Sequence, residues 1–269
     1  MPVTHHPDPS AERAHIRGQE IAFRRAGSGP TLVFLSTVAL SGRWLPIYGQ
    51  LAEHFEVIVP DLPGFGLSPQ GESMRDIDDL VFTLAEFLDE LGVGKFDLVG
   101  HSFGGWVAAE FAAFYPDRIG ALVLITPMGV RVQGEAVADL FRQDAQGRLN
   151  LMLNGNTDLL VDESDEEPLE RLLQDFHDLT GFGRFAWNPR YDIRLDVRLG
   201  RVKNRALIIG ADDDRVVPAS HAARFAELLP NSQQLTIHGT TAPTGHAVHV
   251  QEPAVVAAAI DNFVGGHYA

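Results

Sequence analysis

The residues with the clearest chemical potential surround Ser102. An apolar segment, 96–99, runs into Gly-His-Ser-Phe-Gly at 100–104, and an apolar segment with helical periodicity follows at once. A strand that turns into a helix within one residue holds the serine on a strained backbone, and the two glycines let both elements approach closely. This context is typical of a nucleophilic serine. We therefore interpret Ser102 as a nucleophile rather than as part of a structural turn.

A serine hydroxyl needs a base that takes its proton as it attacks. The chain has 11 histidines, and His246 lies between the apolar run 235–237 and the helix predicted from Pro253. It therefore belongs to a loop at the end of a strand, where open α/β sheets carry their sites. His249 is the competing candidate, which we interpret as a wall or cap contact.

The acid that orients the histidine is expected after the preceding strand, 206–209, where Asp212, Asp213 and Asp214 stand in a row. The pattern Asp-Arg-Val-Val-Pro, counted back from Pro218, favours Asp214 as the acid. Counted forward from Gly210 at the end of the strand, Asp213 is the other candidate. We favour Asp214, because the proline and the helix start behind it fix the loop on that side. Asp212 suits turn chemistry.

The order Ser102, Asp214, His246 is the order described for α/β-hydrolases. From about residue 16 to 263, the chain resembles this fold family, in the branch of capped bacterial serine hydrolases. The resemblance also rests on an Asp-x-x-Gly-x-Gly-x-Ser turn at 61–68 and on a Trp-Asn-Pro segment at 187–189. It implies an α/β fold with a mostly parallel eight-stranded sheet flanked by helices, a helical cap insertion, and hydrolase activity.

The resemblance implies an oxyanion hole made by the backbone N–H groups of Val38 and Phe103. One departure is notable: Ser36-Thr37 stands where the family usually has His-Gly. Backbone donors survive a change of side chain, so we expect the hole to be kept. Plant hydroxynitrile lyases of this fold carry a threonine at the second position of the pair, but they place a lysine where this chain has Ala247.

Composition indicates a globular enzyme of one fold unit. The chain has 269 residues, 45% of them hydrophobic, a formal charge of -15 and no cysteine. The acidic balance argues against nucleic-acid binding, and the absence of cysteine excludes disulfides and thiolate metal sites. The start of the chain has no pattern of a secretory signal, and no apolar run approaches a membrane span. We expect a cytoplasmic protein with no membrane contact, cofactor or metal.

Alternating strand and helix patterns imply a mostly parallel sheet covered on both faces. Strands are expected near residue 15 and at 21–24, 31–35, 56–59, 96–99, 121–125, 206–209 and 234–237. Helices are expected at 77–91, 103–114, 220–229 and 253–263. The corresponding domain boundaries are 11–128 for the first part of the core, 129–190 for the cap and 191–269 for the second part of the core.

The segment 129–190 loses the strand pattern, and helix-like stretches are expected at 135–141, 149–153 and 167–179. The acidic cluster 162–167 is interpreted as a solvated face, with a metal site as the weaker alternative. The candidate substrate-binding residues are Ser36, Thr37, Phe141, Phe176, Trp187 and Ala247. A small-molecule substrate is expected, and a homodimer is possible.

These observations favour acyl transfer to water, with a small hydrophobic ester or lactone as substrate. The main alternative is hydrolysis of a carbon–carbon bond in a ring-cleavage product, a vinylogous 1,5-diketone. Relatives with that activity usually carry a tryptophan directly after the catalytic histidine, where this chain has Ala247. Further alternatives are a cofactor-free lyase like the hydroxynitrile lyases and a non-catalytic ligand receptor.

Overall fold

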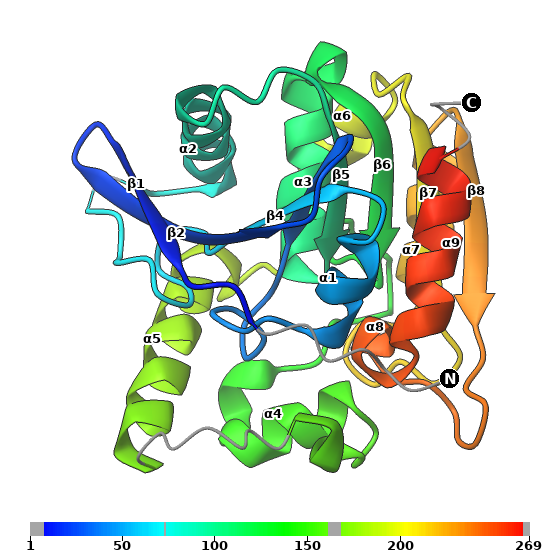
Figure 1. The fold of residues 1–269 in the computed structure, drawn as a ribbon. Coiled ribbons are helices and arrows are strands. Elements are labelled where there is room, and N and C mark those ends of the chain that lie inside the picture. The colour runs from blue at the N-terminus through cyan, green and yellow to red at the C-terminus, as the bar shows by residue number, and fades with distance from the viewer. Residues whose placement is uncertain (1–7, 73, 161–167, 266–269) are drawn as a thin grey trace.

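A computed structural model describes residues 8–72, 74–160 and 168–265. Eight strands form one sheet in the order β1-β2-β4-β3-β5-β6-β7-β8 (Figure 1). β1 pairs with β2 and β2 with β4 in antiparallel register, and the other pairings are parallel. The strands are β1 (Glu12–Ile16), β2 (Gln19–Ala26), β3 (Thr31–Leu35), β4 (Glu56–Pro60), β5 (Phe96–His101), β6 (Ile119–Ile125), β7 (Arg205–Ala211) and β8 (Ser232–Ile237).

Helices cover both faces of the sheet, α1 and α9 on one side and α2, α3, α6 and α7 on the other (Figure 1). Because parallel strands need long crossover connections, α2, α3, α6 and α7 lie between strands in sequence, whereas α9 follows the last strand. The α-helices are α1 (Pro46–Leu51), α2 (Ile77–Glu90), α3 (Phe103–Phe114), α4 (Ala145–Met152), α5 (Pro168–Ala186), α6 (Ile193–Leu199), α7 (Ala219–Leu228), α8 (Val248–Gln251) and α9 (Pro253–Gly265).

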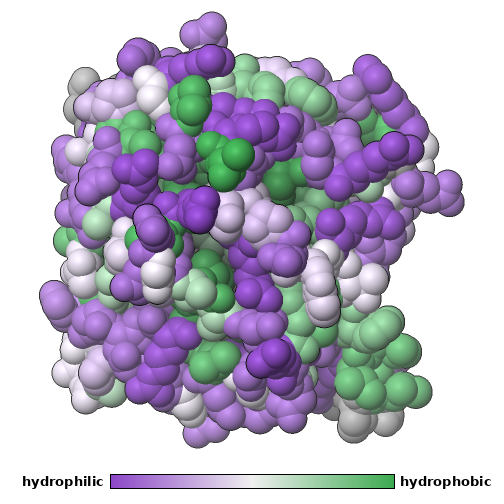
Figure 2. Space-filling model, turned by 180° about the vertical axis from the view of Figure 1, so that it is seen from behind, coloured by the Kyte–Doolittle hydropathy of each residue, from purple (hydrophilic) through white to green (hydrophobic). Residues whose placement is uncertain are grey.

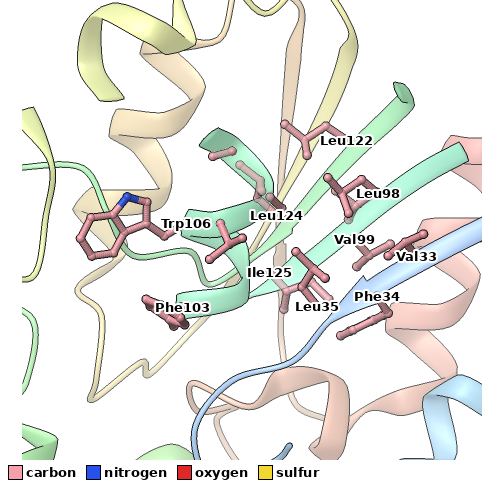
Figure 3. Packing of buried hydrophobic residues seen from close by; sticks show 14 of the residues in the cluster. Val33, Phe34, Leu35, Leu98, Val99, Phe103, Trp106, Leu122, Leu124 and Ile125 are labelled. Atoms are coloured by element: carbon pink, nitrogen blue, oxygen red, sulfur yellow. The ribbon is translucent and has the colours of Figure 1, made fainter. Parts of the chain in front are cut away.

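The core is centred on β3, β5 and β6, whose side chains interlock with the first turns of α3 (Figure 3). Every residue of β5 is buried. A strand covered on both faces has no solvent side, so its sequence does not alternate between apolar and polar residues; the polar residues of β5, Asp97 and His101, are buried as well. Fully burying one Leu, Val or Ile side chain contributes about 1.5–3 kcal/mol. This core fixes the carboxyl ends of the three strands relative to one another.

The segment between β6 and α6 is largely helical and lies at the carboxyl-end side of the sheet (Figure 1). It contains α4, α5 and two short 3₁₀ helices, Leu140–Arg142 and Thr157–Leu160. We call residues 129–190 the helical insertion. The prediction of a helix at 135–141 was wrong. Val132 and Glu135 form a β-bridge around Gly134, which has a φ of +84°, so residue 135 belongs to a tight turn. Residues 136–139 form no regular element, and the 3₁₀ helix Leu140–Arg142 follows.

Other elements differ from the sequence prediction in extent. The helix expected at 167–179 is α5, which continues to Ala186. α1 and α6 were not predicted, because they have only six and seven residues and show too few turns for a periodic pattern. The acidic cluster 162–167 lies outside the described residues. None of the helices in the described ranges is both long and apolar enough to span a membrane.

Candidate active site

Ser102 lies at the sharp turn between β5 and α3. Its φ of 55° and ψ of -114° lie outside the regions that residues with a side chain usually adopt. The strain is held by neighbouring backbone, since the Ser102 N–H donates to the Ile125 carbonyl at 3.0 Å. A Cβ on Gly104 would lie 2.3 Å from the Leu35 carbonyl oxygen, so only glycine allows α3 to approach β3 this closely.

His246 lies in the loop between β8 and α8, and its ring is paired with Asp214. Nδ1 of His246 lies 2.8 Å from Oδ2 of Asp214, and both side chains are buried. The other carboxylate oxygen accepts the N–H groups of Val216 at 2.9 Å and Val217 at 2.8 Å. A carboxylate only accepts, so Nδ1 carries the proton and Nε2 carries a lone pair. Nε2 is buried and has no hydrogen-bond partner among the described residues.

The neighbouring acids are engaged elsewhere. Asp213 has a half-exposed carboxylate that binds Arg215 at 2.7 Å and the amide of Asn154 at 3.2 Å. Asp212 accepts the hydroxyl of Thr244 at 2.7 Å, which braces the loop that leads to His246. Of the three adjacent acids, the structure therefore brings Asp214 to the histidine and turns Asp213 toward solvent.

His249, the competing histidine, is fully buried one turn after His246. Its ring packs against His101, with the ring centroids 4.3 Å apart, and neither of its nitrogens has a hydrogen-bond partner in the described part of the chain. Burial lowers the pKa of His249 to about 3. Such a ring stays neutral and has no carboxylate to orient it, so it lacks the features of a general base.

The loop that follows β3 lies beside the nucleophile. Ser36, Thr37 and Val38 are all buried. The Ser36 carbonyl oxygen would be 2.4 Å from a Cβ on Gly104, which places this loop against the first turn of α3. The Thr37 carbonyl accepts the N–H groups of Leu40 and Ser41 and so closes a turn. Ala247, another of the candidate substrate-binding residues, directly follows His246 and is also buried.

Aromatic rings from the insertion cover the first residue after the nucleophile. The Phe103 ring lies 5.4 Å from Phe65, 5.6 Å from Phe182 and 6.1 Å from Phe185, measured between centroids. Phe141 stacks on Phe182 at 5.2 Å. Helix α5 therefore contributes Phe182 and Phe185 to the apolar cluster around the Phe103 ring.

Two of the candidate substrate-binding residues lie away from this cover. Phe176 is 67% exposed and Trp187 is 63% exposed, although the Trp187 ring contacts Phe141. Phe176 belongs to an apolar stripe on the outer side of α5 that also includes Leu169, Leu172 and Leu173, at the lower right of Figure 2. Phe176 and Trp187 therefore do not lie among the rings that surround Phe103 in this structure, and their role in substrate binding stays a prediction. Gln174, His177 and Asp178 lie on the opposite, inner side of α5.

The inner side of α5 is joined to the core loop 61–71 by hydrogen bonds. Asp178 accepts the Gly66 N–H at 2.8 Å, Gln174 donates to the Gly66 carbonyl at 2.7 Å, and His177 lies 3.0 Å from the Ser68 carbonyl. Burial raises the pKa of Asp178 to about 7. Sequence reasoning missed this contact, because no local pattern distinguishes Asp178 from the other acids of the segment.

The site is closed in this structure. Ser102 is 3% exposed and His246 is fully buried. A hollow of about 440 Å³ lies at the base of the insertion, lined by residues 130–137 and 188–191 together with His221, and its lining includes neither Ser102 nor His246. No group of three or more acids and histidines among the described residues is arranged to hold a metal ion.

Comparison with known proteins identifies the family of this chain. Residues 29–259 match the model of the alpha/beta hydrolase family. The chain therefore belongs to the alpha/beta hydrolase family and is an enzyme of that family.

Relatives within the family differ in activity. A pyrrolizixenacetamide deacetylase of Xenorhabdus hominickii is 23% identical over 253 residues, which are 90% of this chain and 93% of the relative. A 2-hydroxy-6-oxononadienedioate/2-hydroxy-6-oxononatrienedioate hydrolase of Burkholderia vietnamiensis is 32% identical over 196 residues, 66% of this chain and 67% of the relative. The crystal structure of an esterase from a Rhodococcus species superposes with a TM-score of 0.74 at 22% identity, covering 95% of this chain and 98% of the esterase.

Proposed function

We propose that this enzyme hydrolyses a small hydrophobic carboxylic ester or lactone, with Ser102 as nucleophile, His246 as general base and acid, and Asp214 as the residue that orients the histidine. The proposal depends above all on the buried pair of His246 and Asp214, joined at 2.8 Å, and on Ser102 at positive φ, whose preceding residue His101 lies with its Nε2 3.1 Å from the His246 carbonyl. A carboxylate on Nδ1 leaves Nε2 free to take the serine proton.

The reaction then has two acyl transfers. Ser102 Oγ attacks the acyl carbon while its proton passes to His246 Nε2. The bond to the leaving oxygen breaks, and the imidazolium gives that oxygen its proton. Water attacks the acyl-enzyme in the same way and releases the acid and the free serine. With a lactone, the leaving hydroxyl stays attached to the product.

The oxyanion is assigned to the backbone N–H groups of Phe103 and Val38. Phe103 is the first residue of α3, so its N–H has no acceptor within the helix, and the helix N-terminus adds a favourable dipole. Val38 lies in the buried loop that approaches α3 at Gly104. Removing one such donor raises the barrier by about 3 kcal/mol. Ser36, Thr37, Phe141 and Ala247 are proposed as walls of the substrate site.

The preference for a small apolar acyl group is supported by the cover over Ser102. Phe65, Phe182 and Phe185 surround the Phe103 ring, and each buried methylene of a substrate gains about 0.8 kcal/mol in such surroundings. The buried guanidinium of Arg148 in the insertion is already paired with Asp175. A dianionic substrate would therefore bind less favourably than a neutral ester.

We assign residues 129–190 as a cap over a core built from residues 11–128 and 191–269. The ring contacts of Phe182 and Phe185 with Phe103 support a covering role for α5. Because Ser102 and His246 are almost inaccessible in the closed arrangement, substrate entry requires part of the cap to move.

A second candidate is hydrolysis of a carbon–carbon bond in a vinylogous diketone acid. The 32% identity to the Burkholderia vietnamiensis hydrolase favours it. A carbon leaving group must be protonated before it can leave, which demands polar groups beyond the triad. Ala247, small and buried next to His246, offers none at the position where such hydrolases usually carry tryptophan.

A substrate panel separates the two candidates. It contains p-nitrophenyl esters of short to medium acids, aliphatic and aromatic lactones, and a vinylogous diketone acid, each assayed with the wild type and with Ser102→Ala. We expect turnover of the esters or lactones by the wild type only, and poor turnover of the diketone acid. Efficient cleavage of the diketone acid with negligible ester hydrolysis would transfer the assignment to the second candidate.

A further inference from the structure

The carbonyl oxygen of His246 accepts two hydrogen bonds from side chains of other elements. His101 Nε2 lies 3.1 Å from it and Thr126 Oγ1 lies 2.8 Å from it. His101 ends β5 and directly precedes Ser102, and Thr126 directly follows β6. The residue before Thr126, Ile125, accepts the N–H of Ser102. The loop that carries His246 is thus attached to the same two strand ends that hold the serine.

The His101 ring is placed by its neighbours. It lies between the rings of His246, 4.9 Å away, and His249, 4.3 Å away, measured between centroids. A carbonyl only accepts hydrogen bonds, so His101 carries its proton on Nε2. Burial lowers the pKa of both His101 and His249, and the neighbouring histidines lower that of His101 further. Both rings therefore stay neutral when His246 gains a proton.

Thr126 adopts a backbone conformation that its side chain disfavours. Its φ is 41°, a region in which β-branched residues are rare. The strain is held by a hydrogen bond of 2.7 Å from its N–H to the Ile209 carbonyl of β7. Glycine would remove the strain but would also remove the hydroxyl that reaches His246. Strain retained at a buried position next to the nucleophile is a feature of functional sites.

We infer that His101 and Thr126 are positioning residues that hold the base loop, and with it His246 Nε2, at the correct distance from Ser102. This inference rests on the proposed function of the Ser102 site. Because both donors share one acceptor, the loss of either leaves the other in place. The loss of both leaves the His246 carbonyl without these contacts, and the loop is then held only by its other hydrogen bonds, such as those of Thr244 with Asp212 and of Ala247 with Met152. A displacement of about 1 Å at a catalytic group lowers the rate by roughly a hundredfold.

The test uses paired variants that differ only in the donor. Thr126→Val keeps the shape and removes the hydroxyl, whereas Thr126→Ser keeps the hydroxyl. His101→Phe keeps a ring and removes the donor, whereas His101→Gln keeps an N–H near the original Nε2. The readout is the second-order rate at which a fluorophosphonate labels Ser102, because this reaction requires no knowledge of the natural substrate. Circular dichroism and thermal unfolding report the folded fraction of each variant.

Each donor-removing variant is expected to label about fivefold more slowly, and each donor-keeping variant within about twofold of the wild type. The double variant Thr126→Val with His101→Phe is expected to lose at least a hundredfold, more than the product of the single losses. If donor-keeping and donor-removing variants lose equally, or if the double loss equals the product, the inference is overturned. If His101→Phe does not fold, the comparison of Thr126→Val with Thr126→Ser tests the inference by itself. A wild type that is not labelled at Ser102 instead overturns the proposed function.

Discussion

The buried carboxyl group of Asp178 on α5 should make the stability of the fold depend on pH. Its side chain is almost inaccessible, and Oδ1 accepts hydrogen bonds of 2.8 Å from the Gly66 N–H and from the Gln174 amide. Burial raises its pKa to about 7, the two hydrogen bonds oppose the rise, and the nearby carboxylates of Asp61 and Asp175 add to it.

The magnitude follows from the difference between the folded and unfolded states. An aspartate in an unfolded chain has a pKa of about 3.9, and each unit of difference is worth about 1.4 kcal/mol. A folded-state pKa of about 7 therefore corresponds to roughly 4 kcal/mol. Between these two values the folded chain binds a proton that the unfolded chain has released. The free energy of unfolding contributed by this group is thus complete below about pH 4, falls as the pH rises, and is lost above about pH 7.

The assay is urea unfolding of the wild type and of Asp178→Asn from pH 4.5 to pH 8. Relative to the variant, the wild type should lose about 3 kcal/mol of unfolding free energy across this range. Glu170→Gln, an exposed change on the same helix, is the matched control and should parallel the wild type. Asp61, Asp175 and His177 face the same site and are present in all three chains. Curves for the wild type and Asp178→Asn that stay parallel within about 0.5 kcal/mol would refute the reasoning.

Two further predictions concern the site. Asp214→Asn should lower kcat by about four orders of magnitude, because an amide mis-sets the histidine tautomer. Asp213→Asn should lower kcat less than about threefold, and the reverse ranking in steady-state assays would move the orienting role to Asp213. Gly104→Ala should destabilise the fold by about 3 kcal/mol in chemical unfolding, since its Cβ would meet the Leu35 carbonyl at 2.3 Å. Gly200→Ala, where a Cβ meets nothing closer than 3.6 Å, is the control and should stay within about 0.5 kcal/mol; equal effects would contradict the close approach of α3 to β3.

The sheet and its helices could be predicted from the sequence because their patterns are long and periodic. β3, β5, β6 and β7 are buried on both faces, α3 follows β5 after a clear turn signal, and α9 begins at Pro253. The boundaries of these elements shifted by no more than two residues, since hydrogen bonds rather than hydropathy determine where a strand ends. Short elements such as α1 carry too few residues for a period to show.

The relation of the insertion to the site could not be predicted from composition. Helix α5 turns Gln174, His177 and Asp178 inward, where backbone groups of the 61–71 loop accept or donate hydrogen bonds, and leaves Phe176 exposed. A helical wheel alone would have placed Phe176 on the buried face of α5 and the three polar residues on the exposed face. Long-range partners determined the outcome, and no local pattern encodes them.

Around Ser102 the sequence indicated the residues but not their supports. Ser102, Asp214 and His246 could be proposed from the sequence because each follows a predicted strand, in a known order. His101 and Thr126 occupy equivalent positions at the ends of β5 and β6, so adjacency to a predicted strand end was the available signal for both. Their shared acceptor, the carbonyl of His246, lies more than 100 residues away in sequence and becomes visible only in the fold.

The most direct test of the central proposal is the labelling of Ser102 by a fluorophosphonate, followed by mass spectrometry of the intact protein and of its peptides. The predicted result is one adduct per chain on the peptide containing Ser102, loss of ester hydrolysis in proportion to labelling, and no adduct with a folded Ser102→Ala variant. An adduct on another residue, or full hydrolytic activity in Ser102→Ala, would contradict the serine mechanism.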